Sequence, residues 1–472
     1  MAEKVDQSVK QLQKDARAYI WHPFTQMQEW EQATPLLINR GKGTLVYDID
    51  GNAFLDGTSS IWVNLHGHRH PTIDQAIRYQ LTQIAHTTLL GLSHPPAIQL
   101  AKALVKLAPN GLQKVFFSDN GSTAVEIALK MAIQYWQQCP SPQPRKTGFI
   151  HLGLSYHGDT VGSMSLSGIE LFQKPFSSLL FPSPIHLDSP YCYRCPLQLQ
   201  FPQCSLACAD PLEAFLKVKH EEIAGIIIEP MVQGVAGIIP SPPGYLKHVV
   251  ELCRRYRVLF IADEVATGFG RTGRMFACEH EAVSPDIMAI AKGITGGYLP
   301  LAATLTTNEI YSAFLGEPHE GRTFFHGHSY TGNPLGCAAA LANLSIFKTE
   351  RTLTKVKNRT PKFAAFLKTL TDDPWVGDIR QCGYMVGIEL VKNQHTKEPF
   401  PMSDRIGHRV GFTARTLGLL IRPIGNTMIL MPPLSASLKE LQQMVDILKV
   451  AISIVRASKP VEKDAAIDEN RK

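Results

Sequence analysis

The sequence predicts an α/β fold built on a mostly parallel sheet, and three observations support that prediction. Short apolar runs alternate with longer amphipathic stretches through the middle of the chain. The runs are nearly continuous rather than alternating, which is typical of strands covered on both faces. Amphipathic stretches between them complete β-α-β units. Since 472 residues suffice for two or three domains, a smaller α+β unit is expected beside the sheet.

Each element follows from its local pattern. Apolar runs predict strands at 114–118, 148–152, 225–229, 258–263 and 287–291. Helical spacing predicts helices at 123–138 and 244–255. The C-terminal part differs, with strands expected at 378–391 and 427–431 and helices at 405–417 and 437–455. A hairpin is expected around Asp50-Gly51 within an N-terminal arm and short sheet.

Composition and charge exclude several classes of protein. The chain is 44% hydrophobic and 19% charged, which argues against collagen, coiled coil and wholesale disorder. A net charge of +6 is a small excess at this length and gives no support to nucleic-acid binding. No apolar run approaches the ~20 residues that cross a bilayer, and the charged first 19 residues lack a signal core. We expect a cytoplasmic protein without membrane partners.

Nine cysteines form an odd set, so a disulfide framework is not expected. Five are scattered and predicted to be small buried residues: Cys139, Cys253, Cys278, Cys337 and Cys382. Four cluster with spacing that can bind zinc: Cys192, Cys195, Cys204 and Cys208. The favoured interpretation of this cluster is a reduced surface insertion without metal, and a structural metal is the alternative.

An acid and a lysine follow two of the predicted strands. Asp263 ends the run VLFIAD, and Lys292 follows IMAIA and precedes a glycine-rich stretch. Alone, the acid would more often cap a helix and the lysine would lie in a solvated turn. Together at the ligand edge of a sheet they suit pyridoxal 5'-phosphate. The acid would keep the pyridine nitrogen protonated, and the lysine would hold the aldehyde as a Schiff base and move the proton.

The segment 118–123 supplies a candidate phosphate cup. Gly121 and Ser122 lie between a predicted strand and a predicted helix, where free amides attract a dianion. An ordinary N-cap is the alternative interpretation. Tyr156, after the strand at 148–152, is placed to stack on the cofactor ring, or else belongs to the core.

The glycines at 268, 270 and 273 match the dinucleotide fingerprint GxGxxG. However, three residues separate the strand-ending Asp-Glu pair from the first glycine, and no clear helix begins at the third. The pattern therefore gives little support to a nicotinamide oxidoreductase.

The stretch from Phe260 to Gly297 resembles the signature of class-III pyridoxal-phosphate aminotransferases. The resemblance covers nearly the whole chain and includes WHPFTQ, SSIW, SDNGSTAVEIALKMAIQYW, SYHGDT, IIEPMVQG, HGHSYTGNPLGCAAA, IRPIG and LMPPL. WHPFTQ and SYHGDT favour the members that convert 8-amino-7-oxononanoate to 7,8-diaminononanoate in biotin biosynthesis. The resemblance implies a fold type I enzyme with a seven-stranded, mostly parallel sheet, forming a homodimer with shared active sites.

By the same resemblance, the domains divide into an arm and part of the small domain (1–65), a large cofactor-binding domain (66–340), the rest of the small domain (341–456) and a disordered tail (457–472). A non-catalytic protein that kept the fold is the rival hypothesis, and an intact lysine, acid and cup argue against it.

The resemblance also implies site residues. Cofactor binding falls to Gly121, Ser122, Tyr156, Asp263, Lys292, His328 and Ser329, with Lys292 catalytic. Substrate binding falls to Phe24, Trp62, Tyr156, Gly327 and Arg422. The segment of Gly327, His328 and Ser329 would reach in from the neighbouring subunit. Arg422 would receive a substrate carboxylate, which a planar fork suits, although a surface ion pair is the simpler alternative.

The amino donor stays open between two compounds. S-Adenosylmethionine is the family default, but its users typically carry tyrosine at the position of Phe24, tryptophan at Ile61 and tyrosine near Ile429. The residues present here favour lysine as donor. Another class-III omega-aminotransferase activity is the remaining alternative.

Overall fold

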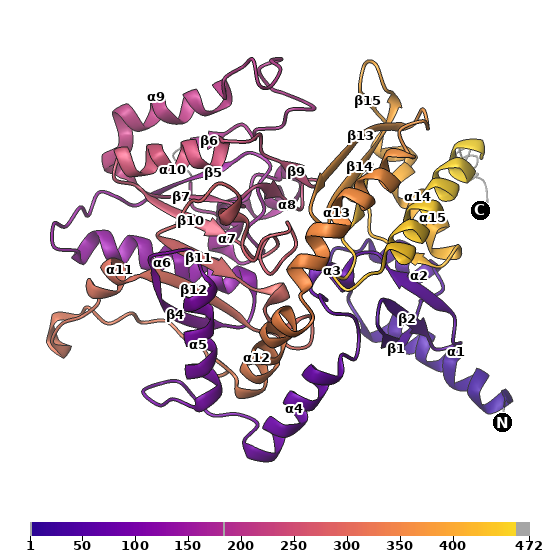
Figure 1. Ribbon diagram of the computed structural model, residues 1–472, viewed down its shortest axis with the longest axis horizontal. Coiled ribbons are helices and arrows are strands. Elements are labelled where there is room, and N and C mark those ends of the chain that lie inside the picture. Colours follow the sequence, from indigo (N-terminus) through magenta and orange to yellow (C-terminus); the bar gives the residue numbers. More distant parts are fainter. Residues whose placement is uncertain (1, 183–184, 459–472) are drawn as a thin grey trace, which may run out of the picture.

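The computed structural model describes residues 2–182 and 185–458. Figure 1 shows two halves: a large sheet flanked by helices, and a second group of strands and helices drawn from both ends of the chain. The tail predicted from residue 457 overlaps the last helix by one residue, and most of it lies outside the described residues.

The large sheet is seven-stranded, with the order β4-β12-β11-β10-β7-β5-β6. β12 is antiparallel to both of its neighbours, and the other strands share one direction. The predicted α/β class with a mostly parallel seven-stranded sheet is therefore confirmed. The strands span Leu112–Ser118 (β4), Gly148–Leu152 (β5), Ile185–Leu187 (β6), Ile223–Ile228 (β7), Leu259–Asp263 (β10), Ile287–Ile290 (β11) and Ala302–Thr307 (β12).

Helices cover both faces of this sheet because its strands are apolar on both sides. Every residue of β7, β10 and β11 is buried, as the continuous apolar runs predicted. α6 packs against β11 and β12, α10 against β10, and α5 against β4. The larger helices here are α4 (Pro71–Gln83), α5 (Pro95–Leu107), α6 (Gly121–Gln138), α9 (Asp210–Lys219), α10 (Tyr245–Arg255) and α12 (Pro334–Thr349).

The second group of elements joins the two chain ends through small sheets. β1, β2 and β3 form an antiparallel ribbon, and β16 from the C-terminal part adds in parallel to β3. The strands are β1 (Ile38–Lys42), β2 (Leu45–Asp48), β3 (Ala53–Asp56), β13 (Val376–Cys382), β14 (Met385–Asn393), β15 (Glu398–Pro399), β16 (Leu419–Leu420) and β17 (Thr427–Leu430). The helices are α1 (Ala2–Tyr19), α2 (Met27–Gln32), α13 (Thr352–Lys368), α14 (Ile406–Thr416) and α15 (Leu438–Ala457).

One element prediction needs correction. The segment 378–391 belongs to two strands, β13 and β14, that pair as a hairpin. The chain turns at Gly383, whose φ is +61°. A side chain at this position would collide with the backbone of Arg271 and Thr272. The prediction of one strand overlooked Gly383, whose positive φ allows the chain to reverse here.

The insertion 190–210 docks on the C-terminal sheet through charged groups. Arg194 donates to Glu389 on β14 (2.7 Å), and the Tyr191 hydroxyl donates to the same carboxylate (2.5 Å). Arg380 on β13 also binds Glu389 (2.6 Å) and donates to the Ile238 carbonyl (2.9 Å). The insertion, the C-terminal sheet and the loop after β8 (Val232–Gln233) are thereby held together.

A buried lysine ties together three loops at the other edge of the sheet. Lys146 Nζ donates to the carbonyls of His220 (2.6 Å), Ile223 (3.2 Å) and Arg257 (3.0 Å). Its ammonium also lies 4.7 Å from the centroid of the Trp136 ring. Burial lowers the pKa of Lys146 to about 8.

No helix in the described ranges is long and apolar enough to cross a membrane.

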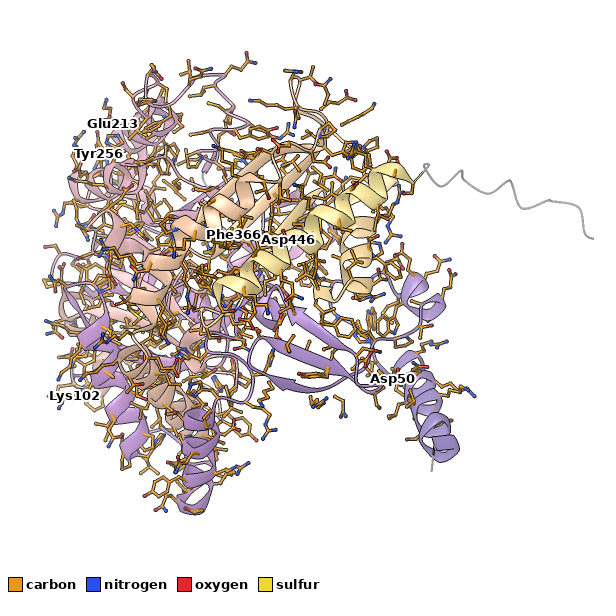
Figure 2. The ribbon with its side chains drawn as sticks, turned by 45° about the vertical axis from the view of Figure 1, so that its right-hand side comes forward. Asp50, Lys102, Glu213, Tyr256, Phe366 and Asp446 are labelled. Atoms are coloured by element: carbon orange, nitrogen blue, oxygen red, sulfur yellow. The ribbon has the colours of Figure 1, made fainter. Side chains whose placement is uncertain are left out.

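We predict that Lys146→Met destabilises the fold strongly, because three buried carbonyls lose their donor. The expected loss is at least about 3 kcal/mol in the free energy of unfolding, measured by urea denaturation at pH 7. Lys102→Met, on the exposed face of α5, is the matched control and should change stability by less than about 0.5 kcal/mol (Figure 2). Equal stability of the two variants would contradict the structural role of Lys146.

Candidate functional site

The carboxyl ends of the parallel strands bring the predicted site residues to one edge of the sheet. β10 pairs with β11 in parallel, with Asp263 opposite Ala289. Asp263 ends β10, and Lys292 follows β11 as the first residue of a short 3-10 helix, Lys292–Thr295. β4 ends at Ser118 on the same edge, so α6 begins there. The expectation that the acid, the lysine and the cup share an edge is met.

Asp263 is held by a histidine that the sequence reasoning did not single out. His157 Nδ1 lies 2.7 Å from Asp263 Oδ2, and the His157 side chain is fully buried. Because a carboxylate only accepts, His157 donates from Nδ1. The other carboxylate oxygen accepts from the Val265 amide (3.1 Å). Asp263 is thus oriented by hydrogen bonds on both of its carboxylate oxygens.

Lys292 adopts a strained backbone conformation at the end of β11. Its φ is +44°, in the left-handed region that side chains rarely adopt. Its ammonium lies 5.3 Å from the centroid of the Trp62 ring. Burial lowers the pKa of Lys292, while the charges of Asp263 and Glu229 oppose the shift. The lowered pKa increases the fraction of neutral amine, which is the nucleophilic and basic form.

Trp62 reaches this position from one turn of left-handed backbone. Ser59, Ser60, Ile61 and Trp62 all have φ between +50° and +72°. Asp56 stabilises the turn by accepting from the Ser60 amide (2.9 Å) and the Ser60 hydroxyl (2.8 Å). Each such residue costs of order 1 kcal/mol, so the surrounding structure must hold the turn in place.

Glu229 is a second carboxylate at this edge. It follows β7 and is buried, and it accepts from the amides of Tyr156 (3.0 Å) and Gly234 (2.8 Å). Burial raises the pKa of Glu229 to about 7, with His157 opposing and Asp263 adding to the rise. The run GIIIE ends in an acid just as VLFIAD does, so the same pattern would have identified Glu229.

The phosphate cup predicted at Gly121 and Ser122 lies at the N-terminus of α6. Asn120 caps the helix, and its side chain and that of Thr123 form a reciprocal capping box. Within the described residues no hydrogen bond uses the amides of Gly121 and Ser122, which leaves them for an anion. A side chain at Gly121 would lie 2.6 Å from Val265. Only glycine allows this close approach.

Ser122 is fixed by a cluster of hydroxyl groups. Its Oγ lies 2.6 Å from Ser163 Oγ and 3.0 Å from Thr160 Oγ1, and it accepts from the Thr160 amide (3.0 Å). Gly158 has a φ of +127°, and a side chain there would run into Ser122. The segment after β5 therefore closes over the cup.

The predicted substrate residues are arranged around a row of aromatic rings. Tyr156 lies 6.3 Å from Phe172, and Phe172 lies 5.3 Å from Phe24, both edge to face. The Tyr156 hydroxyl donates to Asp159 (2.7 Å). Arg422 is exposed and donates to the Phe24 carbonyl (3.1 Å). The structure thus brings Phe24, Tyr156 and Arg422 into one neighbourhood.

The three side chains that bear on the choice of amino donor differ in exposure. Phe24 and Ile61 are exposed, whereas Ile429 on β17 is completely buried in a cluster with Trp62. Ile429 therefore has no exposed surface that a donor could contact.

Gly327, His328 and Ser329 lie away from the lysine within one chain. Gly327 and Ser329 are exposed, and the nearest atom to a side chain added at Gly327 would belong to Leu90. His328 accepts from the Tyr330 amide (3.2 Å). No contact with Ser122 or Lys292 is formed by this segment in the described chain.

Arg271 explains why the glycines at 268, 270 and 273 match the dinucleotide fingerprint without forming a dinucleotide site. It is completely buried between Gly270 and Gly273 and donates to the carbonyls of Asn64 (2.9 Å) and Pro432 (2.6 Å). Burial lowers the pKa of Arg271 to about 9. The stretch joins both chain ends to the large sheet instead of binding a dinucleotide, and no helix begins at its third glycine.

The four clustered cysteines line one small cavity together and are all free thiols. Burial raises the pKa of the Cys208 thiol to about 11. Among the residues described, no group of three or more His, Cys, Asp or Glu side chains is placed to hold a metal ion. The scattered cysteines are buried, apart from Cys382, which is partly exposed.

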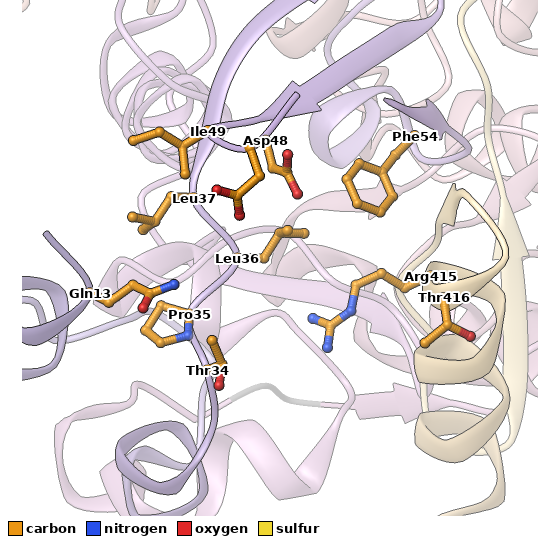
Figure 3. Close-up of a pocket in the computed structure, with 11 residues that line it drawn as sticks. Gln13, Thr34, Pro35, Leu36, Leu37, Asp48, Ile49, Phe54, Arg415 and Thr416 are labelled. Atoms are coloured by element: carbon orange, nitrogen blue, oxygen red, sulfur yellow. The ribbon is translucent and has the colours of Figure 1, made fainter. Parts of the chain in front are cut away.

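A separate cavity of about 280 Å³ lies between α1, the segment before β1, the β2–β3 turn and α14, and not at the sheet edge that carries Asp263 and Lys292. Figure 3 shows Phe54 and Arg415 on its right-hand side, with Gln13 and Pro35 on the left. None of the predicted site residues lines it, so it plays no part in the site.

The residues at the sheet edge fit pyridoxal 5'-phosphate. A dianion needs free amides at a helix N-terminus, which Gly121 and Ser122 provide. A pyridinium needs a fixed carboxylate, which Asp263 provides. An aldehyde needs an amine of lowered pKa, which Lys292 provides. In addition, Ser118 Oγ and His157 Nε2 are buried at this edge without a hydrogen-bond partner, as expected where a polar group binds.

Comparisons with known proteins agree with this geometry. The class-III aminotransferase family model matches residues 26–452. An adenosylmethionine-8-amino-7-oxononanoate aminotransferase from Nitratidesulfovibrio vulgaris is 51% identical over 93% of this chain and 81% of its own. The protein of the same name from Geobacter sulfurreducens is 49% identical over 95% of this chain and 99% of its own.

Solved structures give the same result. The aminotransferase of that name from Methanocaldococcus jannaschii superposes with a TM-score of 0.89 at 45% identity, over 94% of this chain and 99% of its own. An omega transaminase from Pseudomonas jessenii in complex with PMP gives a TM-score of 0.89 at 31% identity, over 94% of this chain and 98% of its own. With the family model spanning most of its length and relatives at half identity, the chain belongs to the class-III aminotransferases, which use pyridoxal phosphate.

Proposed function

We propose that the chain transfers an amino group to 8-amino-7-oxononanoate and forms 7,8-diaminononanoate in biotin biosynthesis, with S-adenosylmethionine as donor. The observation that supports this proposal most directly is the lowered pKa of Lys292, which lies with the His157–Asp263 pair at the edge of the large sheet where α6 begins. The names of relatives near 50% identity supply the substrate pair. The decisive test is formation of 7,8-diaminononanoate by the purified protein, with S-adenosylmethionine and with lysine as donors.

The residues divide the chemistry between them. Pyridoxal phosphate, when bound, supplies a protonated ring that withdraws electrons from the carbon whose C–H bond breaks. Asp263, held by His157, would hold the proton of the ring nitrogen. The amides of Gly121 and Ser122 would bind the phosphate. Lys292 would anchor the cofactor and, as a neutral amine, would take a proton from the substrate on Nζ and later return it.

We propose that the substrate binds beside the aromatic rings of Phe24, Phe172 and Tyr156. Arg422 is exposed beside Phe24, where its guanidinium can bind a substrate carboxylate through two parallel hydrogen bonds. Trp62 lies over the Lys292 ammonium, and Tyr156 packs edge to face against Phe172. Omega transaminases share the fold at 30–33% identity, so that activity is the second candidate function.

We further propose a homodimer with shared sites and the two-domain division predicted from the sequence. Apolar side chains gather in two adjacent exposed segments, with Leu90 75% and Phe325 79% exposed. The segments touch where the rings of His86 and Tyr330 lie 4.8 Å apart. Burial of this patch by a second copy would carry the 327–329 segment to the neighbouring cup. A cytoplasmic location remains a prediction of the sequence.

Lys292→Ala should abolish transamination, because both the covalent anchor and the proton carrier are lost. We expect a fall in kcat of at least about 10²–10⁴-fold, measured by product formation at saturating substrates. Borohydride reduction of the wild-type holoenzyme, followed by peptide mapping, should place the cofactor on Lys292. Near-normal turnover of the variant would overturn the assignment.

Asp263→Asn should leave cofactor bound while slowing proton abstraction by about 10²–10³-fold, because the neutral amide cannot hold the ring proton. Rapid-mixing spectroscopy with donor alone measures this half-reaction. The neighbouring Glu264→Gln is a matched control for removing a buried carboxylate. Similar rates in wild type and Asp263→Asn would reduce Asp263 to a structural role.

Phe24→Tyr should shift donor preference toward S-adenosylmethionine, because the added hydroxyl provides a hydrogen bond that phenylalanine lacks. The measurement is a competition assay with S-adenosylmethionine and lysine at equal concentration, on wild type and variant. An unchanged donor ratio would mean that Phe24 does not set the choice.

A further inference from the structure

We propose that Glu229 is a positioning residue that holds Tyr156 and, through Gly234, Trp62 in place around Lys292. The inference deepens the proposed function, because it concerns the geometry of the same site. It rests on contacts of this chain's own residues, and no role for Glu229 has entered the mechanism above.

The first support is the pair of hydrogen bonds that Glu229 makes. Oε1 accepts from the Tyr156 amide at 3.0 Å, and Oε2 accepts from the Gly234 amide at 2.8 Å. The two amides belong to loops after different strands, β5 and β8. One buried carboxylate therefore fixes the spacing between two loops that border the lysine.

The second support is the close packing of Gly234 against Trp62. A side chain at position 234 would lie 3.0 Å from Trp62 Cζ3 and 3.5 Å from Glu229 Oε2. The backbone at Gly234 therefore forms a floor beneath the indole. Since the indole lies over the Lys292 ammonium, a shift of Gly234 moves the wall of the site.

Ionisation controls both bonds. Ionised Glu229 accepts on both oxygens, whereas the protonated acid must turn one O–H toward an amide donor and lose that bond. The titratable groups that face Glu229 are Tyr156, His157, Asp263 and Lys292. With a pKa of about 7, Glu229 is ionised above neutrality and protonated below it. Activity should therefore fall as pH decreases through about 7.

The test compares Glu229→Gln with wild-type holoenzyme. Glutamine keeps one acceptor oxygen but presents N–H to the other amide, so one loop is released at every pH. We expect kcat/KM at pH 8.5 to fall about tenfold or more and the acid limb near pH 7 to disappear. Hydrogen exchange should increase at Tyr156 or Gly234.

The absorbance of the bound cofactor supplies a readout independent of turnover. An anionic Glu229 favours the protonated form of the nitrogen on Lys292, so Glu229→Gln should lower the pH midpoint of the absorbance change. The matched control is Glu264→Gln, since Glu264 is also buried and also accepts from an amide, that of Cys278 (2.8 Å). Glu264 is not among the largest influences on the pKa of Lys292, so this variant should shift the midpoint less than Glu229→Gln does.

Three outcomes would overturn the proposal: an unchanged midpoint in Glu229→Gln, an acid limb that persists in it, or an equal shift in Glu264→Gln. If Glu229→Gln does not fold, amide hydrogen exchange of the wild-type protein tests the role of Glu229 instead. Protection of the Tyr156 and Gly234 amides, corrected for intrinsic exchange, must then fall below pH 7. The absorbance and hydrogen-exchange measurements do not require 8-amino-7-oxononanoate. A wrong substrate assignment can therefore be distinguished from a wrong role for Glu229.

Discussion

The parallel pairing of β10 with β11 is the constraint on which the site depends. It places Asp263 and Lys292 at one edge in fixed register, and the shared direction of β4, β5 and β7 brings the α6 N-terminus, the Tyr156 loop and Glu229 to the same edge. A slip of one residue in this pairing would turn the Asp263 side chain to the opposite face. The antiparallel β12 leaves this edge intact, because it contributes no site residue among those described.

The remaining wall comes from outside the large sheet and is held by strain and polar contacts. Trp62 depends on a left-handed turn that Asp56 stabilises, and Gly234 lies under its ring. Arg380 holds the loop after Gly234 through the carbonyls of Gly237 and Ile238, and Glu389 links Arg380 to the cysteine-bearing insertion. Residues far from Lys292 therefore determine how its surroundings are shaped.

Much of the fold was predictable because buried strands and amphipathic helices leave direct patterns in the sequence. The strands that became β5, β7, β10 and β11 were predicted to within two residues, since nothing else fits continuous apolar runs of that length. The turn at Gly383 was missed because its close packing against the backbone of residue 271, which leaves no room for a side chain, involves a position more than a hundred residues away in the chain. Lysine 292 and Asp263 were identifiable from strand ends.

Other parts of the site required coordinates. His157 looks like any histidine until its contact with Asp263 is known, and the four residues of the left-handed turn carry no glycine to mark it. Ile429 illustrates the reverse case, since a residue expected to bear on the amino donor is completely buried in the apolar cluster that contains Trp62. Sequence patterns report which face is apolar, but they do not report which of two buried faces meets a ligand.

The turn at 59–62 also has a consequence for the order in which the site can form during synthesis. Ser59 Oγ donates to the Met431 carbonyl (2.7 Å), the Met431 amide donates to Gly57 (2.8 Å), and β3 pairs with β16. A chain synthesised only as far as Lys292 lacks β12, through which β4 joins the sheet, and it lacks Met431 and β16, which bind Ser59 and β3. The nascent protein therefore passes through a stage with an anchoring amine and an unfinished wall, which closes only as the last few dozen residues emerge.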